Sequence, residues 1–249
     1  MILKSCVLVC TAILCGGSAV AAEIKLMAST GVRAVMNELA PQFEKSTGHK
    51  LVTDFAVIAI LKRRIEAGEA FDVVIPGPEL VDELVRQGKV AADTRAAFGR
   101  TGVSLGVRKG APKPDISTPE KLKRVLLDAK AVGHSREGQS GVHFRAALER
   151  LGIAKEMAPK LRPYDDGGSS VALQKGEIDI AASGTGPILE MPGADYLGGL
   201  PPEVQSYVRF SIGVSAAAKD PQAARALARF LPSPAVAPAF KARGLEREP

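Results

Sequence analysis

Short apolar runs alternate with amphipathic segments along most of the chain. Residues 24–28 form the first apolar run, and Val32, Val35, Leu39 and Phe43 follow at helical spacing. A strand pattern that is repeatedly followed by a helix pattern is typical of parallel sheets covered by helices. The chain is therefore predicted to be an α/β protein.

Strands are expected at residues 24–28, 50–56, 71–75, 103–107, 131–133, near 161, at 178–182 and at 208–216. Helices are expected between them, with ends at Gly48, Gly68, Gly88 and Gly152. Pro41 is expected to kink or restart the first helix, because proline has no amide and crowds the preceding turn. Ser117 and Glu120 are expected to form a capping box, and Asp220 with Pro221 to open the last long helix.

Two long strand patterns, 103–108 and 208–214, enclose a central block of about one hundred residues. The helices after residue 216 have no sheet of their own, so they are expected to return to the first sheet. This order predicts two α/β lobes joined by two strands, with lobe 1 formed by residues 23–104 and 212–249 and lobe 2 by residues 105–211. A cleft is expected between the lobes.

The N-terminal segment has the pattern of a secretory signal peptide over residues 1–22. Lys4 precedes an apolar run at residues 7–14, and small residues at 19–22 favour cleavage near Ala22. The apolar run is shorter than the roughly 20 residues of a membrane helix. All three cysteines, Cys6, Cys10 and Cys15, lie in this segment, so the exported chain is expected to have no thiol chemistry.

Charge and composition exclude some partners. Removal of Lys4 with the signal segment leaves 32 of the 33 basic residues against 27 acidic ones, a net charge of +5. Basic residues are interleaved with acidic ones and aromatic residues make up only 4%, so nucleic acid is not an expected partner. The mild basic excess is consistent with attraction of small anions.

The loops after the strands are the expected binding sites, because ligands of open α/β sheets bind outside the carboxyl ends of the strands. The helix that follows each loop directs its first amides and the positive end of its dipole at the cleft, which suits an anion. The candidate ligand-binding residues are Ser29, Thr30, Gly31, Val57, Ile58, Ser140, Gly141, Gly168, Ser169 and Ser183. A simpler alternative is that Ser29 or Thr30 only caps the next helix.

No pattern of a metal site, cofactor site or catalytic nucleophile is found. His49, His134 and His143 lack the spacing of metal ligands, although His143 could donate a hydrogen bond to a ligand. No dinucleotide, phosphate-loop or nucleophile-elbow motif is present. A non-enzymatic protein without cofactors is expected, and the rival hypothesis is an enzyme that uses Asp165 and Asp166 as an acid–base pair.

Several blocks together resemble the periplasmic solute-binding proteins of ABC transporters, in the molybdate-binding-like group. The blocks are Ser29-Thr30 after the first strand, residues 41–48, 65–68, 71–75 and 228–231. The resemblance implies a two-lobed type II periplasmic binding protein fold, a periplasmic location, closure of the lobes on a small anionic ligand and delivery to an inner-membrane permease. A monomer is expected.

The resemblance does not fix the ligand. Molybdate-binding members hold the oxyanion with two serines, a tyrosine and backbone amides. In this chain the first serine aligns with Gly31, the second falls in residues 57–59, which carry no hydroxyl, and the tyrosine falls near Ser183. The amide-bearing small residue aligns with Ser140. The ligand is therefore expected to be a molybdate-like oxyanion or a small organic acid with an apolar part, and a periplasmic sensor subunit is a further alternative.

Overall fold

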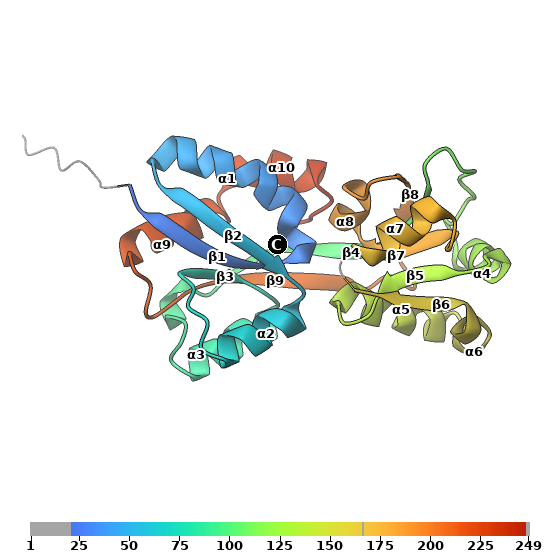
Figure 1. Cartoon of the computed structure of the whole chain (residues 1–249), viewed down its shortest axis with the longest axis horizontal. Helices are drawn as coiled ribbons and strands as arrows, with labels where there is room; N and C mark the ends of the chain where they lie inside the picture. Colours follow the sequence, from blue (N-terminus) through green and yellow to red (C-terminus); the bar gives the residue numbers. More distant parts are fainter. Residues whose placement is uncertain (1–20, 166, 248–249) are drawn as a thin grey trace, which may run out of the picture.

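The described chain forms two lobes that are connected by two strands. The computed structural model describes residues 21–165 and 167–247, so nearly all of the predicted signal peptide, and Asp166, lie outside the described residues. In each lobe helices lie on both sides of a group of strands, and β4 (Ala96–Arg108) and β9 (Tyr207–Val214) run between the lobes (Figure 1). The predicted two-lobed α/β fold is confirmed.

Lobe 1 is a three-layered unit. Its strands are β1 (Glu23–Ser29), β2 (Lys50–Ala56) and β3 (Val73–Ile75). Its helices are α1 (Arg33–Thr47), α2 (Ile58–Glu66), α3 (Pro78–Arg86), α9 (Pro221–Phe230) and α10 (Ala237–Ala242). β1 is parallel to β2 and β3, and its residues alternate between two cores: Leu26 packs on the side of α1 and α10, and Met27 on the side of α2 and α3.

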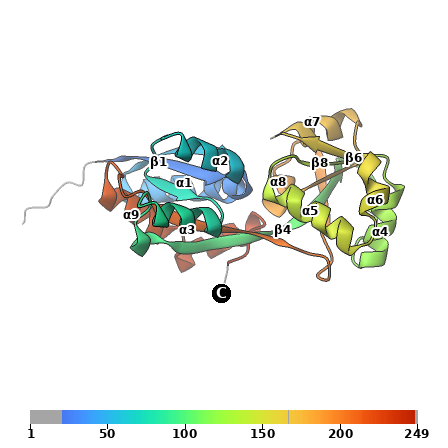
Figure 2. The same cartoon turned by 90° about the horizontal axis from the view of Figure 1, so that it is seen from below.

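Lobe 2 repeats this arrangement. Its strands are β5 (Val132–Ser135), β6 (Leu161–Tyr164), β7 (Ile180–Gly184) and β8 (Ala194–Gly199). Its helices are α4 (Pro119–Asp128), α5 (Gln139–Arg150), α6 (Ala154–Met157), α7 (Gly168–Lys175) and α8 (Thr185–Leu189). Figure 2 shows α4, α5 and α6 away from α7. β7 separates them, because Ile180 and Ala182 pack with Phe144 of α5 and Ala181 packs with Leu173 of α7.

Single-turn 3-10 helices join some of these elements. They are η1 (Thr30–Val32), η2 (Ala92–Thr94), η3 (Ala158–Lys160) and η4 (Pro234–Val236). The strand order is β2-β1-β3-β9-β4-β7-β5-β6, with β8 beside β4. Within the described ranges, no helix is long and apolar enough to cross a membrane.

β4 changes partner where the chain passes between the lobes. Its residues up to Gly102 pair with β9, and from Val103 onward it pairs with β7. Tyr207, the first residue of β9, lies opposite Gly102. The predicted boundaries at 104 and 212 lie close to these positions, and we propose that the lobes divide at Gly102 and Tyr207.

Two local predictions are corrected by the structure. The cap of α4 is Thr118, whose Oγ1 accepts a hydrogen bond from the amide of Lys121 at 3.3 Å, and not Ser117. Pro119 fits the first helical position, which places the cap one residue after the predicted one. Of the two outcomes predicted for Pro41, the restart is wrong, since α1 runs through Pro41 without interruption, and the kink stays a prediction.

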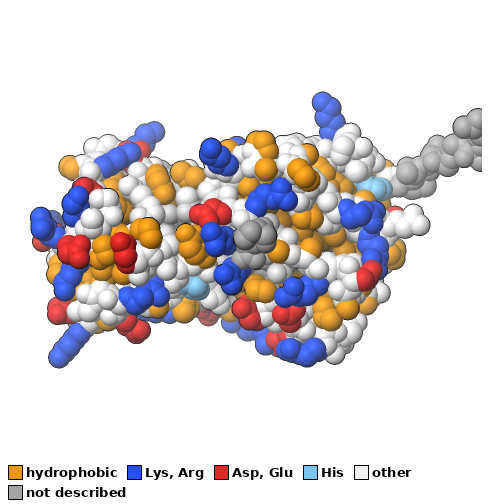
Figure 3. Space-filling model, turned by 180° about the vertical axis from the view of Figure 1, so that it is seen from behind, with side chains coloured by type: hydrophobic (Ala, Val, Ile, Leu, Met, Phe, Trp, Pro, Cys, Tyr) orange, Lys and Arg blue, Asp and Glu red, His pale blue; other side chains and the backbone are white. Residues whose placement is uncertain are grey.

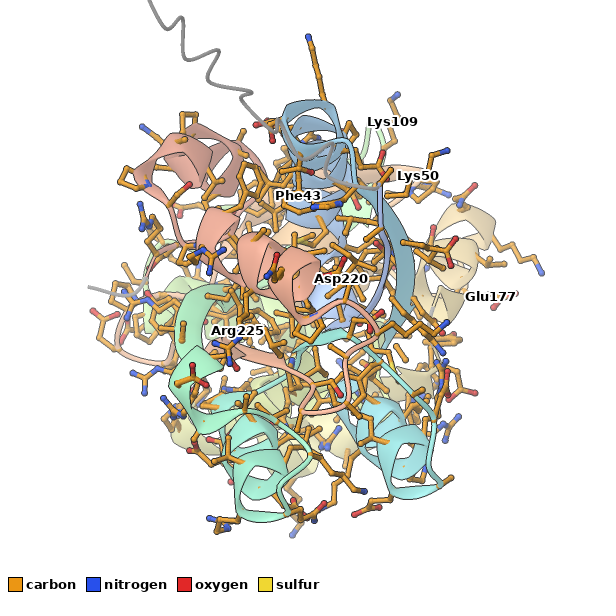
Figure 4. All side chains as sticks on the ribbon, turned by 90° about the vertical axis from the view of Figure 1, so that its left-hand side faces the viewer. Phe43, Lys50, Lys109, Glu177, Asp220 and Arg225 are labelled. Carbon is orange, nitrogen blue, oxygen red and sulfur yellow. The ribbon has the colours of Figure 1, made fainter. Side chains whose placement is uncertain are left out.

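The C-terminal helices return to lobe 1, as predicted from their lack of a sheet. Asp220 caps the start of α9, and its Oδ1 accepts hydrogen bonds from the amides of Gln222 and Ala223 at 3.0 and 2.9 Å, which confirms the predicted opening of this helix. The Phe43 ring of α1 lies 5.5 Å from that of Phe230. Figure 4 shows Asp220 at one end of α9 and Phe43 in the neighbouring core.

Acid is expected to destabilise lobe 1 through a network around Arg64. Arg64 and Lys25 donate hydrogen bonds to Glu69 and lower its pKa to about 2 from the usual 4.5, and the hydrogen bond from Arg64 also lowers the pKa of Asp54. A lowered carboxyl pKa contributes stability that is complete above about pH 4.5 and is lost as the pH falls toward 2. The thermal midpoint should fall across this range less steeply in Arg64→Ala than in wild type.

The matched control for this measurement is Arg124→Ala, since Arg124 is exposed on α4. Its midpoint should follow the wild-type pH profile. Equal slopes for Arg64→Ala and wild type between pH 4.5 and 2 would contradict the role given to the network.

Candidate functional site

A cavity of about 370 Å³ lies between the lobes, against the strands that connect them. Its walls come from the carboxyl ends of β1, β2, β5, β6 and β7 and from the helix starts that follow. Thr101 of β4 and Val208 and Phe210 of β9 also line it. The chain thus brings loops from both lobes to one partly open cavity, in the place of the predicted cleft.

Most of the candidate residues line this cavity. They are Ser29, Thr30, Gly31, Val57, Ile58, Ser140, Ser169 and Ser183. Gly141 and Gly168 do not. Gly141 is buried against the carbonyl of Ser135, and Gly168 lies against the ring of Tyr164. Gly141 follows the lining residue Ser140 and Gly168 precedes the lining residue Ser169, but both glycines lie on another side of their helices.

Three helices of eight or more residues begin at the cavity without a side-chain cap, and the short α8 also begins there, after Gly184. The residues before α2, α5 and α7 are Val57, Gly138 and Gly167, none of which has a side-chain oxygen, and all three line the cavity. The first amides of a helix have no acceptor within the helix. Because two of these helices belong to lobe 2 and one to lobe 1, amide donors and positive dipole ends meet from both sides.

Ser29 at the end of β1 does act as a helix cap. Its side chain accepts a hydrogen bond from the amide of Gly31 at 3.3 Å, and it is 5% exposed. The predicted capping by Ser29 is therefore observed, and Ser29 also lines the cavity. Thr30 lies beside it on the cavity wall.

The start of α5 is held by a loop that the candidate set omitted. Ser135 Oγ accepts a hydrogen bond from the Gly138 amide at 2.9 Å, and both residues line the cavity with Gln139. Under this loop, His134 Nδ1 lies 2.9 Å from the Ser135 carbonyl oxygen. Burial lowers the pKa of His134, so its neutral ring can donate to that carbonyl at neutral pH.

Charged side chains at the cavity are few. Among the described residues, those that line it are Arg33, Asp165 and Glu190. The Arg33 guanidinium lies 5.3 Å from the centre of the Phe55 ring, and Asp165 Oδ1 lies 3.2 Å from Arg136 Nε. The site therefore offers an anion mainly amides and hydroxyls, which are hydrogen-bond donors without full charge.

The chain matches the family described as bacterial extracellular solute-binding proteins over residues 24–246. The chain belongs to this family. The predicted resemblance to periplasmic binding proteins of the molybdate-binding group is confirmed by the relatives and structures that follow. The family supports an extracytoplasmic location for this solute-binding protein, and the signal peptide itself stays a prediction.

Named relatives point to more than one ligand. The solute-binding protein and an aconitate isomerase of Pseudomonas sp. are 32% identical over 236 residues. The aligned region covers 91% of this chain and 88% of the relative. The solute-binding protein is 28% identical to the molybdate-binding protein ModA of Escherichia coli (strain K12) over 63% of each chain. The first of these similarities leaves the predicted absence of enzyme activity open.

Solved structures share the fold. The periplasmic molybdate-binding protein of Azotobacter vinelandii superimposes with a TM-score of 0.77 at 16% identity, covering 91% of this chain and all of that one. The sulfate-binding protein SubI of Mycobacterium tuberculosis does so with a TM-score of 0.73 at 18% identity, covering 91% and 87%.

His143, a possible ligand donor in the sequence, faces a different space. It lines a neighbouring cavity of about 490 Å³ between α3 and α5, together with Glu79 and Arg209. Burial and nearby Arg150 lower the pKa of His143.

No group of residues suited to a metal ion is found in the described ranges. The face in Figure 3 shows basic side chains scattered among acidic ones.

An ion pair between Arg63 and Glu137 joins the two lobes beside the cavity. Arg63 of α2 lies 3.0 Å from Glu137 in the loop before α5, with 60% and 41% of the side chains exposed. Exposed pairs contribute about 0.2–1 kcal/mol. Glu137→Gln is therefore expected to weaken ligand binding up to about fivefold at low salt, measured by titration calorimetry, and the effect should disappear near 500 mM salt.

Glu38→Gln is the matched control, because Glu38 pairs with Arg243 at 2.7 Å entirely within lobe 1. Its affinity should equal that of wild type at both salt concentrations. If both variants weaken binding alike, the Arg63–Glu137 pair has no specific part in closure.

Proposed function

We propose that this protein is an extracytoplasmic receptor that captures a small organic acid between its lobes and delivers it to an ABC transporter. The observation that carries the proposal is the meeting of three uncapped helix starts, from both lobes, at one cavity. Each start is worth about 0.3–1 kcal/mol for an anion, and up to about 2 kcal/mol when partly buried. Hydroxyls from Ser140 and Ser169 add donors at the starts of α5 and α7, and Thr30 adds one from η1.

The size and apolar walls of the cavity favour an organic ligand over a tetrahedral oxyanion. Pockets for organic ligands have volumes of about 300–1,000 Å³, and the volume of about 370 Å³ lies in this range. Several lining residues are apolar, namely Val57, Ile58, Pro187, Met191, Val208 and Phe210. These side chains suit the hydrocarbon part of a ligand whose carboxylates lie at the helix starts.

The similarity to an aconitate isomerase suggests the class of acid. Aconitate is a short unsaturated chain with three carboxylates. Separate helix starts can each receive one carboxylate, so a ligand with two or three carboxylates would use more of the site than a monocarboxylate. We therefore propose a di- or tricarboxylate of about this length as the ligand.

Calorimetric titration tests this function. Trans-aconitate, the saturated tricarboxylate tricarballylate and succinate are compared with molybdate and sulfate. We expect a dissociation constant near or below micromolar, about −8 kcal/mol, for a tricarboxylate, and binding at least tenfold weaker for both oxyanions. Tighter binding of molybdate than of every carboxylate would overturn the proposal.

An isomerase is the second candidate, and the Pseudomonas relative is what favours it. Moving the double bond of aconitate requires a group that takes a proton from one carbon and returns it to another. The carboxylates of Asp165 and Glu190 line the cavity, and both residues are exposed.

Incubation of trans-aconitate with the protein in heavy water, followed by proton NMR, tests the isomerase. Turnover that Asp165→Asn or Glu190→Gln abolishes would establish it. Binding without appearance of the cis isomer or exchange of carbon-bound hydrogen would leave the receptor as the function.

A further inference from the structure

The ring of Phe210 occupies the space that a side chain at position 31 would need. Gly31 lies in η1 on the cavity wall, and a Cβ there would be 2.5 Å from Phe210 Cζ and 3.1 Å from Cε1. Real Cβ atoms do not approach so closely, so position 31 is restricted to glycine as long as the ring is in place.

The ring itself is held firmly. Phe210 is 1% exposed and belongs to the lobe 1 core, and its backbone in β9 pairs with Gly99 of β4. The next residue, Ser211, donates its amide to the Pro76 carbonyl at 3.0 Å. The ring is therefore a fixed part of the scaffold behind Gly31, with almost none of its own surface open to the cavity.

This contact keeps a side-chain hydrogen-bond donor out of position 31, between Thr30 and the apolar residues of β9. Gly31 contributes no hydroxyl, its amide is bonded to Ser29 Oγ, and Val208 continues the apolar wall next to Phe210. A tetrahedral oxyanion presents oxygens in every direction and needs donors on all sides. A carboxylic acid presents oxygens at its ends and hydrocarbon between them, and the hydrocarbon can lie against apolar lining residues without loss of hydrogen bonds.

We propose that the Gly31–Phe210 contact determines specificity by making the cavity prefer organic carboxylates to tetrahedral oxyanions. This inference rests on the proposed function. An oxyanion oxygen that lacks a donor from position 31 is expected to reduce affinity about tenfold or more, because hydrogen bonds to charged groups are the stronger kind.

The test is the ratio of the affinities for trans-aconitate and molybdate in matched variants. Phe210→Leu removes the ring atoms nearest Gly31, and Gly31→Ser in the same chain places a hydroxyl in the vacated space. The control Phe98→Leu makes the same change at a ring that is 3% exposed in the same core but does not line the cavity.

The double variant should reduce the preference for trans-aconitate at least tenfold, with molybdate binding more tightly than in wild type. Phe98→Leu should keep the ratio within twofold of wild type. Phe210→Leu alone should weaken trans-aconitate at least threefold and leave molybdate unchanged, which keeps a readout if the double variant does not fold. Circular dichroism of each unliganded variant checks folding.

The outcomes separate this inference from the proposed function. One outcome is that wild type binds trans-aconitate while Phe210→Leu and the folded double variant both keep the wild-type preference for trans-aconitate over molybdate. In that case the specificity role of Gly31 and Phe210 is wrong, and the receptor function stands. If wild type binds no carboxylate, both fail. An equal change of ratio in Phe98→Leu would show that the effect comes from core packing and would also overturn the inference.

Discussion

Gln139→Pro is expected to reduce the affinity for the organic acid at least tenfold while the protein stays folded. Gln139 is the first residue of α5 and lines the cavity, and proline removes its amide. Hydrogen bonds to charged groups contribute about 1.5–3 kcal/mol, which corresponds to about 10- to 150-fold in affinity. The preceding Gly138 has an extended backbone at φ −72° and ψ 147°, which a following proline accepts.

Calorimetry with trans-aconitate measures the loss, and thermal unfolding of the unliganded protein measures folding. Gln139→Ala is the matched control, since it changes the same side chain and keeps the amide. The control should bind within about threefold of wild type. Equal losses in the proline and alanine variants would mean that the side chain, and not the helix start, contacts the ligand.

Gly141→Ala is expected to destabilise lobe 2 and to abolish tight binding together. A Cβ at this position would overlap the carbonyl oxygen of Ser135 and lie 3.0 Å from its carbonyl carbon. Backbone atoms cannot rotate away as a side chain does, so α5 and the Ser135 loop must separate. Overpacking of this kind costs about 1–3 kcal/mol, and occasionally more. Because the same loop positions Gly138 and Gln139 at the cavity, we expect at least tenfold weaker binding.

Urea unfolding and calorimetry measure the two effects. The control is Gly152→Ala, at a glycine with φ +67° and no atom within 4 Å of the added Cβ. It should cost about 1 kcal/mol through its left-handed backbone and leave affinity unchanged. Wild-type stability for Gly141→Ala would show that this contact is looser than described.

The strand–helix rhythm predicted the architecture because most core positions are strongly apolar and regularly spaced. β4 is the exception: it begins at Ala96, whereas the strand was predicted from residue 103. Its first half contains Gly99, Arg100 and Gly102, residues that do not give an alternating apolar pattern. β8 was missed for a similar reason, since it ends in two glycines. Both segments are strands because of the partners they pair with.

The helix starts at the cavity were predictable because loops at the carboxyl ends of parallel strands must meet at one edge. Phe210 and Thr101 were not predictable as lining residues. Phe210 lies in an apolar strand, so the sequence pattern predicts an ordinary core residue. Its ring lies against Gly31 in the structure, where β9 pairs with β4. Ser135 was missed because its hydrogen bond to Gly138 depends on the turn conformation before α5.

A crystal structure of the protein with trans-aconitate tests the central claim most directly. The account predicts carboxylate oxygens within about 3 Å of first-turn amides of α5 or α7 in lobe 2 and of α2 in lobe 1, with the hydrocarbon part against the apolar lining residues. A ligand held only by side chains, or bound outside the space between the lobes, would contradict it.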